Sequence, residues 1–140
     1  MRELPRGWVE TTLAEIGKWG SGGTPKKGHP GYYGGPIPWA VIGDLNDSLV
    51  STTQNSITAL GLKESSAKLV EPGSLLIAMY GSIGKLGIAG MEMATNQAIA
   101  FCRPNRLMET KYLFWYLFSQ RHALASIIRP TTERAVRASA

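Results

Sequence analysis

The sequence predicts an α/β domain of the mixed α+β kind, with a twisted mixed β-sheet, one long C-terminal helix, short helices and long loops. Three short apolar runs at 75–80, 86–89 and 98–102 are separated by small and polar residues, and they predict three strands of one sheet. Because these runs lack strict alternation, we expect strands that are buried on both faces. A long apolar pattern at 110–128 predicts the helix.

Length and composition indicate one folded domain in a reducing compartment. The chain has 140 residues, 44% of them hydrophobic and 18% charged, and a single Cys. Pro5, Arg6 and Gly7 interrupt any apolar leader after Met1. The most apolar stretch, 112–120, is too short to span a bilayer. We therefore expect a cytoplasmic protein with no membrane partner.

The positive charge lies in the last quarter of the chain. Residues 1–102 hold eight Lys and Arg against eight Asp and Glu, whereas residues 103–140 hold seven against two, which gives the net charge of +5. A basic segment favours polyanionic partners. A solvated basic end explains the same counts equally well.

The chain is expected to begin with an ordered extended segment at 4–10 and one short helix. Pro5 and Gly7 exclude a helix from that segment. Thr12 and Glu15 then fit a capping box, and Gly17 ends the helix that it would start.

Residues 20–36 form the longest stretch that is predicted to be irregular. Seven of these 17 residues are Gly and three are Pro. The candidate contact residues among them are Thr24, Lys26, Lys27, His29, Tyr32 and Tyr33. Cations, hydroxyls and aromatic rings on a long loop are typical of nucleic-acid contact, with Lys at phosphates and polar groups at base edges. The alternative is a mobile surface loop whose tyrosines pack back on the core.

Short elements bounded by turn residues follow this loop. The expected series is a strand at 37–42, a turn at 43–47, anchors at Leu49, Val50 and Ile57, a helix at 58–64 with Thr58 as N-cap, a strand at 68–70 and a turn at 72–73.

The helix at 110–128 is apolar almost all round in its first half. We expect it to be buried mainly in the core of its own domain, with packing against a partner as the alternative. Residues 129–140 offer no apolar anchor and are expected to fray.

Residues 81–85, Gly-Ser-Ile-Gly-Lys, resemble part of a phosphate-binding P-loop but do not fit the pattern. Met79 stands where the first Gly is required, and Leu86 stands where Ser or Thr should follow the Lys. The segment after Lys85 also reads as a strand, so no helix N-terminus would face a phosphate. A hairpin turn that carries Ser82 and one cation fits better.

No pattern in the sequence supports catalysis or metal binding. His29, Cys102 and His122 are far apart in the chain, and Asp44 and Asp47 fit a turn that caps itself. No strand–turn–helix fingerprint for a dinucleotide or methyl donor is present. We therefore predict no enzyme activity and no bound cofactor.

Asn96 and Gln97 form the one polar pair at a strand start. Such amides satisfy backbone groups at a turn, or they bind an adenine edge with two hydrogen bonds. The sequence leaves both roles open.

Taken in order, several segments resemble a target-recognition domain of the specificity subunit of type I restriction–modification enzymes. The segments are LPRGWVETTLAEIGKWGSGGTP, YYGGPIPWAVIGDL, SSAKLVEPGSLLIAMYGSIGKLGIAG and ATNQAIAFCRP, followed by an aromatic-rich helix that ends in SQR. The resemblance covers about Leu4 to Arg129. It therefore predicts one DNA-binding domain over 1–129, with a basic tail over 130–140.

The resemblance implies a recognition role in bacterial defence. Family subunits read a bipartite double-stranded DNA target with two such domains joined by long helices, and the loops of each domain face the DNA. Modification (methyltransferase) subunits methylate adenine with S-adenosylmethionine, and restriction (motor-nuclease) subunits use ATP and Mg. These cofactors belong to the partner subunits, and none is expected here. The usual spacer helix and second domain are absent from this chain, so a homodimer of half-subunits is a further expectation.

The shared motifs suggest scaffold or phosphate roles for 22–25, Gly84-Lys85 and Asn96-Gln97, while bases would be read by less regular segments. The full set of predicted DNA-binding residues is Thr24, Lys26, Lys27, His29, Tyr32, Tyr33, Asn46, Ser82, Lys85, Asn96 and Gln97. The alternative function is a protein-interaction or dimerisation module that associates through the apolar helix and binds DNA too weakly to be useful alone.

Overall fold

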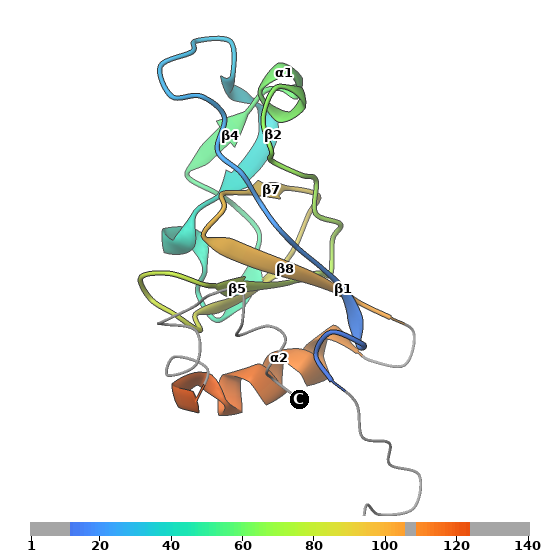
Figure 1. Cartoon of the computed structure of the whole chain (residues 1–140). Coiled ribbons are helices and arrows are strands. Elements are labelled where there is room, and N and C mark those ends of the chain that lie inside the picture. The colour runs from blue at the N-terminus through green and yellow to red at the C-terminus, as the bar shows by residue number, and fades with distance from the viewer. Residues whose placement is uncertain (1–11, 106–108, 124–140) are drawn as a thin grey trace, which may run out of the picture.

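The computed structural model describes residues 12–105 and 109–123, which form two β-sheets and a few helices (Figure 1). The elements are β1 (Gly17–Ser21), β2 (Tyr33–Ala40), the 3-10 helix η1 (Ile42–Asp44), β3 (Ser48–Val50), β4 (Asn55–Ile57), α1 (Ala59–Lys63), β5 (Leu75–Ala78), β6 (Leu86–Ala89), β7 (Ala94–Thr95), β8 (Ile99–Pro104) and α2 (Thr110–Ser119). The mixed α+β class is confirmed, but the strands form two sheets where one was predicted.

The larger sheet has the strand order β1-β8-β5-β6-β3. The first four strands pair antiparallel, and β3 joins β6 in parallel. The three runs predicted as neighbouring strands are β5, β6 and β8. Leu75 and Ile77 belong to the core cluster that contains the α2 residues, whereas Leu76 and Ala78 belong to a second cluster. The prediction of burial on both faces is therefore confirmed.

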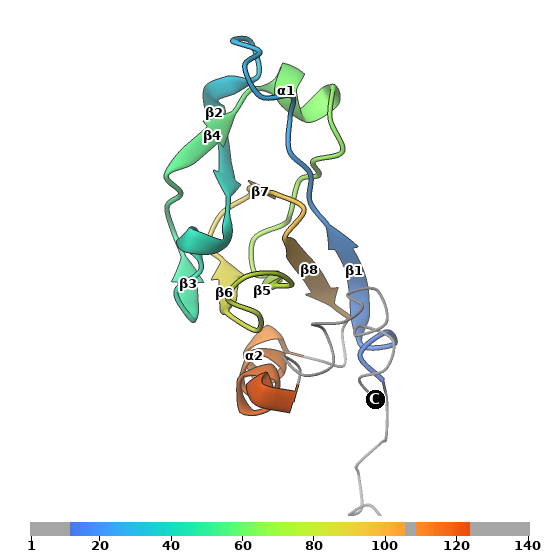
Figure 2. The same ribbon diagram turned by 60° about the vertical axis from the view of Figure 1, so that its left-hand side comes forward.

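The smaller sheet has the order β4-β2-β7 and lies between the larger sheet and α1 (Figure 2). Its own core contains Trp39, Ile57, Ala67 and Ala94. The pairing of β2 with β4 shifts register between Tyr33 and Ile37, and Pro36 and Pro38 supply no N–H in this stretch. β2 pairs with β4 on one side and with β7 on the other, in a sheet separate from the larger one.

Helix α2 packs on the larger sheet with only one face. Leu113, Phe114 and Leu117 are buried. Four aromatic residues of the same helix are exposed, namely Tyr112, Trp115, Tyr116 and Phe118. The prediction that the domain's own core buries most of this helix is therefore wrong, because a helix that lies on a sheet offers it a single stripe.

Some local predictions are confirmed and others are corrected. Thr58 caps α1, since its Oγ1 accepts the Gly61 N–H at 2.9 Å. Thr12 and Glu15 do bond to each other, but they lie in a turn and no helix follows, because β1 begins at Gly17. The expected strand at 68–70 is a single bridge from Val70 to Met93.

Other expectations fall on residues outside the described ranges. These are the extended segment at 4–10, the end of the long helix at 124–128 and the frayed tail at 129–140. Within the described residues, no helix is long and apolar enough to cross a membrane.

Candidate nucleic-acid interface

The loop between β1 and β2 begins as a rigid segment at 22–25. Trp39 Nε1 donates to the Gly23 carbonyl at 3.0 Å, and the Gly23 N–H donates to the Thr95 carbonyl at 2.9 Å. A Cβ at Gly23 would lie 2.1 Å from Ser66 Oγ, so only glycine fits there. Tyr33 donates its hydroxyl to the Pro25 carbonyl at 2.5 Å, and this holds Tyr33 in the scaffold.

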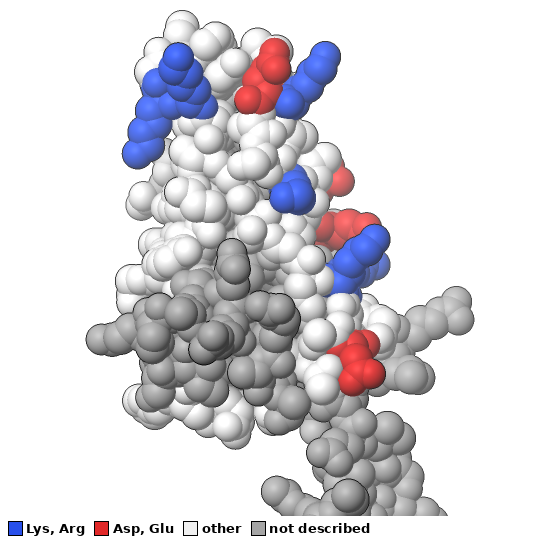
Figure 3. Space-filling view, in the orientation of Figure 1, with Lys and Arg blue, Asp and Glu red and all other residues white. Residues whose placement is uncertain are grey.

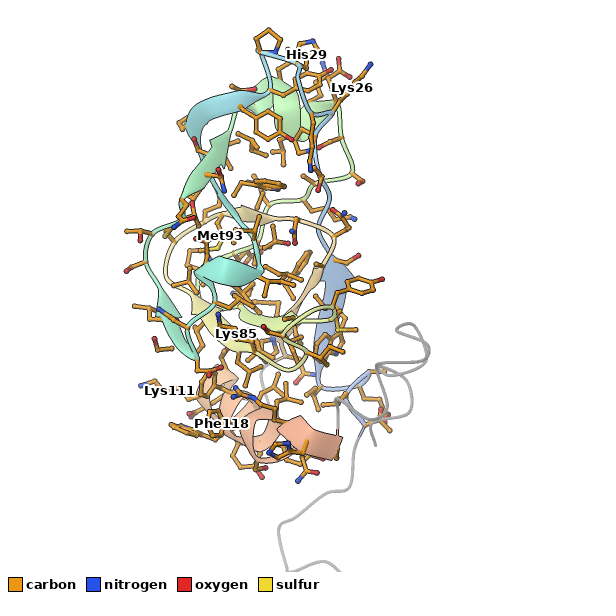
Figure 4. The ribbon with its side chains drawn as sticks, turned by 90° about the vertical axis from the view of Figure 1, so that its left-hand side faces the viewer. Lys26, His29, Lys85, Met93, Lys111 and Phe118 are labelled. Atoms are coloured by element: carbon orange, nitrogen blue, oxygen red, sulfur yellow. The ribbon has the colours of Figure 1, made fainter. Side chains whose placement is uncertain are left out.

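The tip of the loop carries exposed cations and an aromatic stack. Lys26, Lys27 and His29 are exposed. The His29 ring stacks on Tyr32 with centroids 3.7 Å apart and planes 9° apart. Since His29 Nδ1 accepts the Gly31 N–H at 3.2 Å, the proton of the neutral ring lies on Nε2. Lys26 and His29 lie at the end of the molecule opposite α2 (Figure 4).

Thr24, Asn96 and Gln97 come together directly behind this tip. Thr24 Oγ1 donates to Gln97 Oε1 at 2.5 Å. Asn96 Oδ1 accepts the Ala98 N–H at 3.1 Å, and the Asn96 N–H donates to the Ala40 carbonyl at 3.0 Å. Gln97 therefore joins the loop after β1 to the connection between β7 and β8, while Asn96 caps the turn of that connection and bonds to β2 through its backbone.

Ser82, Lys85 and Asn46 form a second group near α2. The Lys85 N–H donates to the Ser82 carbonyl at 3.1 Å within the turn between β5 and β6. Asn46 precedes Asp47, whose N–H donates to the Leu86 carbonyl at 2.7 Å. Because strand β6 follows Lys85, the rejection of a P-loop is confirmed.

The predicted site residues therefore lie in two groups and not on one loop. Lys85 lies near Lys111 of α2, far from Lys26 (Figure 4). A single duplex that touches both groups would have to run along the length of the domain.

An ion pair that the sequence did not predict holds together the two turns that carry the second group. Arg121 Nη2 lies 2.5 Å from Asp47 Oδ1, and Arg121 Nε donates to the Gly84 carbonyl at 3.2 Å. Asp47 has a φ of 58°, in the left-handed region, and its Oδ1 also accepts the Leu86 N–H at 2.9 Å. The sequence predicts the turn at Asn46-Asp47 but not its ion pair with Arg121. The predicted self-capping holds for Asp44, which accepts the Val41 N–H at 2.9 Å.

Positive charge at the tip has no acidic partner among the described residues. The ion pairs seen within 12–105 and 109–123 join Arg121 to Asp47 and Arg103 to Glu71. The face drawn in Figure 3 carries a group of Lys or Arg at the upper left, while acidic and basic side chains lie beside one another to the right of it and further down. Lys26 and Lys27 are therefore free to meet an anion.

Cys102 is a core residue. It is buried in the cluster between the larger sheet and α2, and burial raises the pKa of its thiol from 9.0 to about 12. Among the described residues, no three His, Cys, Asp or Glu side chains are grouped so that they could hold a metal ion.

A family model and two of the most similar curated proteins all describe type I specificity subunits. The family model described as the type I restriction modification DNA specificity domain matches residues 5–139. The MjaIX specificity subunit of Methanocaldococcus jannaschii is 30% identical over 122 residues, which are 85% of this chain and 28% of that protein. The HindI specificity subunit of Haemophilus influenzae is 26% identical over 112 residues, 79% of this chain and 24% of that protein.

Solved structures share the fold. The HsdS subunit from Thermoanaerobacter tengcongensis superposes with a TM-score of 0.74 at 22% identity, covering 89% of this chain and 30% of that one. A chain from a study of complex assembly in the type I R-M system gives the same TM-score at 23% identity, covering 88% and 30%. This chain thus spans less than a third of the relatives that it matches.

Proposed function

Since the chain belongs to the family of type I restriction modification DNA specificity domains, we propose that it binds double-stranded DNA and reads one half of a bipartite target. The family that the sequence predicted is confirmed. Its members are DNA specificity domains, which agrees with the prediction that this chain is not an enzyme.

The observation that carries the proposal is the tip between β1 and β2. Lys26 and Lys27 are exposed and have no acidic partner among the described residues, and they follow a segment that is fixed at Gly23 and Pro25. Cations on a rigid base are suited to phosphate contacts, because little conformational freedom is lost on binding. The stacked His29 and Tyr32 beside them offer a donor and an aromatic ring to a groove.

Selection from random duplexes at low salt tests this function directly. Enrichment of one short motif, followed by measured binding of that duplex above a scrambled one, is the expected result. Each mismatch in the motif should cost about 1–3 kcal/mol. Recovery of unenriched sequences with a steep salt dependence would leave only backbone binding, and no binding to any duplex would overturn the proposal.

The remaining family functions belong to the assembly. We propose that this domain directs adenine methylation and restriction that modification and restriction subunits carry out, and that S-adenosylmethionine, ATP and Mg are bound by those subunits. Addition of purified partner subunits to the DNA-bound domain, with methylation of the selected motif as the readout, would test this role. The boundary near residue 129 also stays a prediction.

A second role as a protein-interaction module is favoured by the exposed face of α2. Trp115 is 63% exposed and Tyr112 is 56% exposed. Aromatic residues are enriched at protein interfaces, so a partner subunit or a second copy of this chain could cover this face. It lies at the end of the domain opposite the tip, and the two roles are therefore compatible (Figure 4).

A further inference from the structure

Three side-chain amides of the predicted DNA-binding set share one feature, which is that each oxygen is already bound within the protein. Asn96 Oδ1 accepts the Ala98 N–H at 3.1 Å, and Gln97 Oε1 accepts the Thr24 hydroxyl at 2.5 Å. Asn46 Oδ1 accepts two bonds from Ser48, one from the N–H at 3.1 Å and one from Oγ at 3.0 Å.

The NH₂ groups of the same amides have no partner in the part of the chain that the structure describes. No hydrogen bond from the amide nitrogen of Asn46, Asn96 or Gln97 is present there. Asn46 and Gln97 are exposed, and Asn96 is half-buried. All three side chains can therefore offer donors to a ligand at the surface.

The free NH₂ donors of the three amides determine which groups on DNA these side chains can bind. Two-point recognition of adenine uses the amide oxygen and nitrogen side by side, as acceptor from N6 and donor to N7. Both lone pairs of Asn46 Oδ1 are in use, so this oxygen would have to give up or share a bond to accept from N6. Asn96 and Gln97 keep one lone pair each, but the bond that each oxygen already makes fixes the direction in which it can accept. A phosphodiester oxygen accepts hydrogen bonds only, so it needs nothing but the free N–H groups.

His29 at the tip has the same polarity, since its Nδ1 accepts from Gly31 and its Nε2–H is left as an outward donor. The Tyr33 hydroxyl differs, because its proton is donated to Pro25 and only its oxygen can accept a further bond. Lysine side chains are donors only.

We infer that Asn46, Asn96 and Gln97 bind phosphodiester oxygens through their NH₂ groups and do not read adenine. This inference rests on the proposed DNA binding and deepens it, because it assigns the amides to positioning on the backbone. Other side chains of the tip would then contact the base edges.

Isosteric acids test the assignment. Asn46→Asp, Asn96→Asp and Gln97→Glu keep the oxygen that the protein uses and replace the NH₂ donor with a second oxygen that repels phosphate. Each variant should weaken binding to the selected duplex and to a scrambled duplex by the same factor, about tenfold or more for a bond to a charged group. Gln120→Glu is the matched control, because it adds the same charge next to the C-terminus of α2 and should change binding little.

Modified duplexes separate the two sources of acceptors. A single methylphosphonate at the contacted position should remove most of the difference between the wild-type domain and the variant, whereas 7-deazapurines should leave that difference intact. The inference is overturned if the acids bind as tightly as the wild type, or if they lose affinity only where the target contains adenine at one position. Failure of the wild-type domain to bind any duplex would instead overturn the proposed function and this inference with it.

Discussion

The guanidinium of Arg121, two residues after the last residue of α2, binds the carboxylate of Asp47, which lies 74 residues earlier in the chain. The same side chain donates to the Gly84 carbonyl and lies over the Phe118 ring, 4.5 Å from its centroid. Arg121 thus joins α2 to the turn that presents Ser82 and Lys85.

Removal of this contact should loosen the turn. The pair is partly exposed, with 28% of the Arg121 and 32% of the Asp47 side chain accessible. We therefore expect Arg121→Ala to lower the free energy of unfolding by about 1 kcal/mol, after solvent screening is taken into account. Urea denaturation measures this loss. Arg103→Ala is the control, because its pair with Glu71 is more exposed and should contribute about 0–0.5 kcal/mol. Equal losses in the two variants would contradict the special role of Arg121.

Gly23→Ala should destabilise the base of the loop. The new Cβ would lie 2.1 Å from Ser66 Oγ and 2.6 Å from the Ala67 nitrogen, and the second contact is with backbone. Overpacking of this kind costs about 1–3 kcal/mol, which a thermal melt would reveal. Gly43→Ala meets nothing within 4 Å and should melt close to the wild type.

The double variant Lys26→Ala/Lys27→Ala should weaken binding to all duplexes alike. Loss of two phosphate contacts lowers the slope of log K against log salt by about 1.8. Titrations at several salt concentrations give that slope. Lys18→Ala/Arg103→Ala removes the same charge from the paired strands β1 and β8, outside both predicted groups, and should preserve the slope. An unchanged slope in the Lys26/Lys27 variant would remove these two residues from the interface.

Trp115→Ala should alter association and leave the fold intact. The side chain is 63% exposed, so we expect a change in unfolding free energy within about 0.5 kcal/mol. If a second copy covers α2, sedimentation will show a concentration-dependent dimer that this variant loses. Leu117→Ala on the buried face should instead cost about 2–5 kcal/mol of stability.

Cys102 should resist thiol reagents while the domain is folded. Its side chain is buried, and its pKa of about 12 keeps the thiol protonated well above the ordinary value of 9.0. Labelling at pH 7 and pH 9 should be equally slow, and unfolding in urea should make it fast. Rapid labelling of the native domain at pH 9 would contradict this burial.

Local signals explain the elements that the sequence predicted correctly. The apolar runs that became β5, β6 and β8 carry their own pattern, and Thr58 caps α1 through a contact three residues away. The capping box at Thr12 and Glu15 shows the limit of such signals. The side-chain contact forms, but Gly17 pairs with Pro104 in the sheet, and this pairing overrides a helix.

Periodicity, turn residues and motif order are encoded in neighbouring residues, and they suffice to predict the mixed fold, the central strands, the family and the Gly-rich loop. Four features appear only once the chain is folded: the division into two sheets, the bond between Thr24 and Gln97, the pairing of Arg121 with Asp47 and the exposure of four aromatics on α2. Each of these depends on contacts between segments far apart in the chain. No local pattern reports which hydrogen-bond partner a side chain will meet, or which face of a helix a sheet will cover.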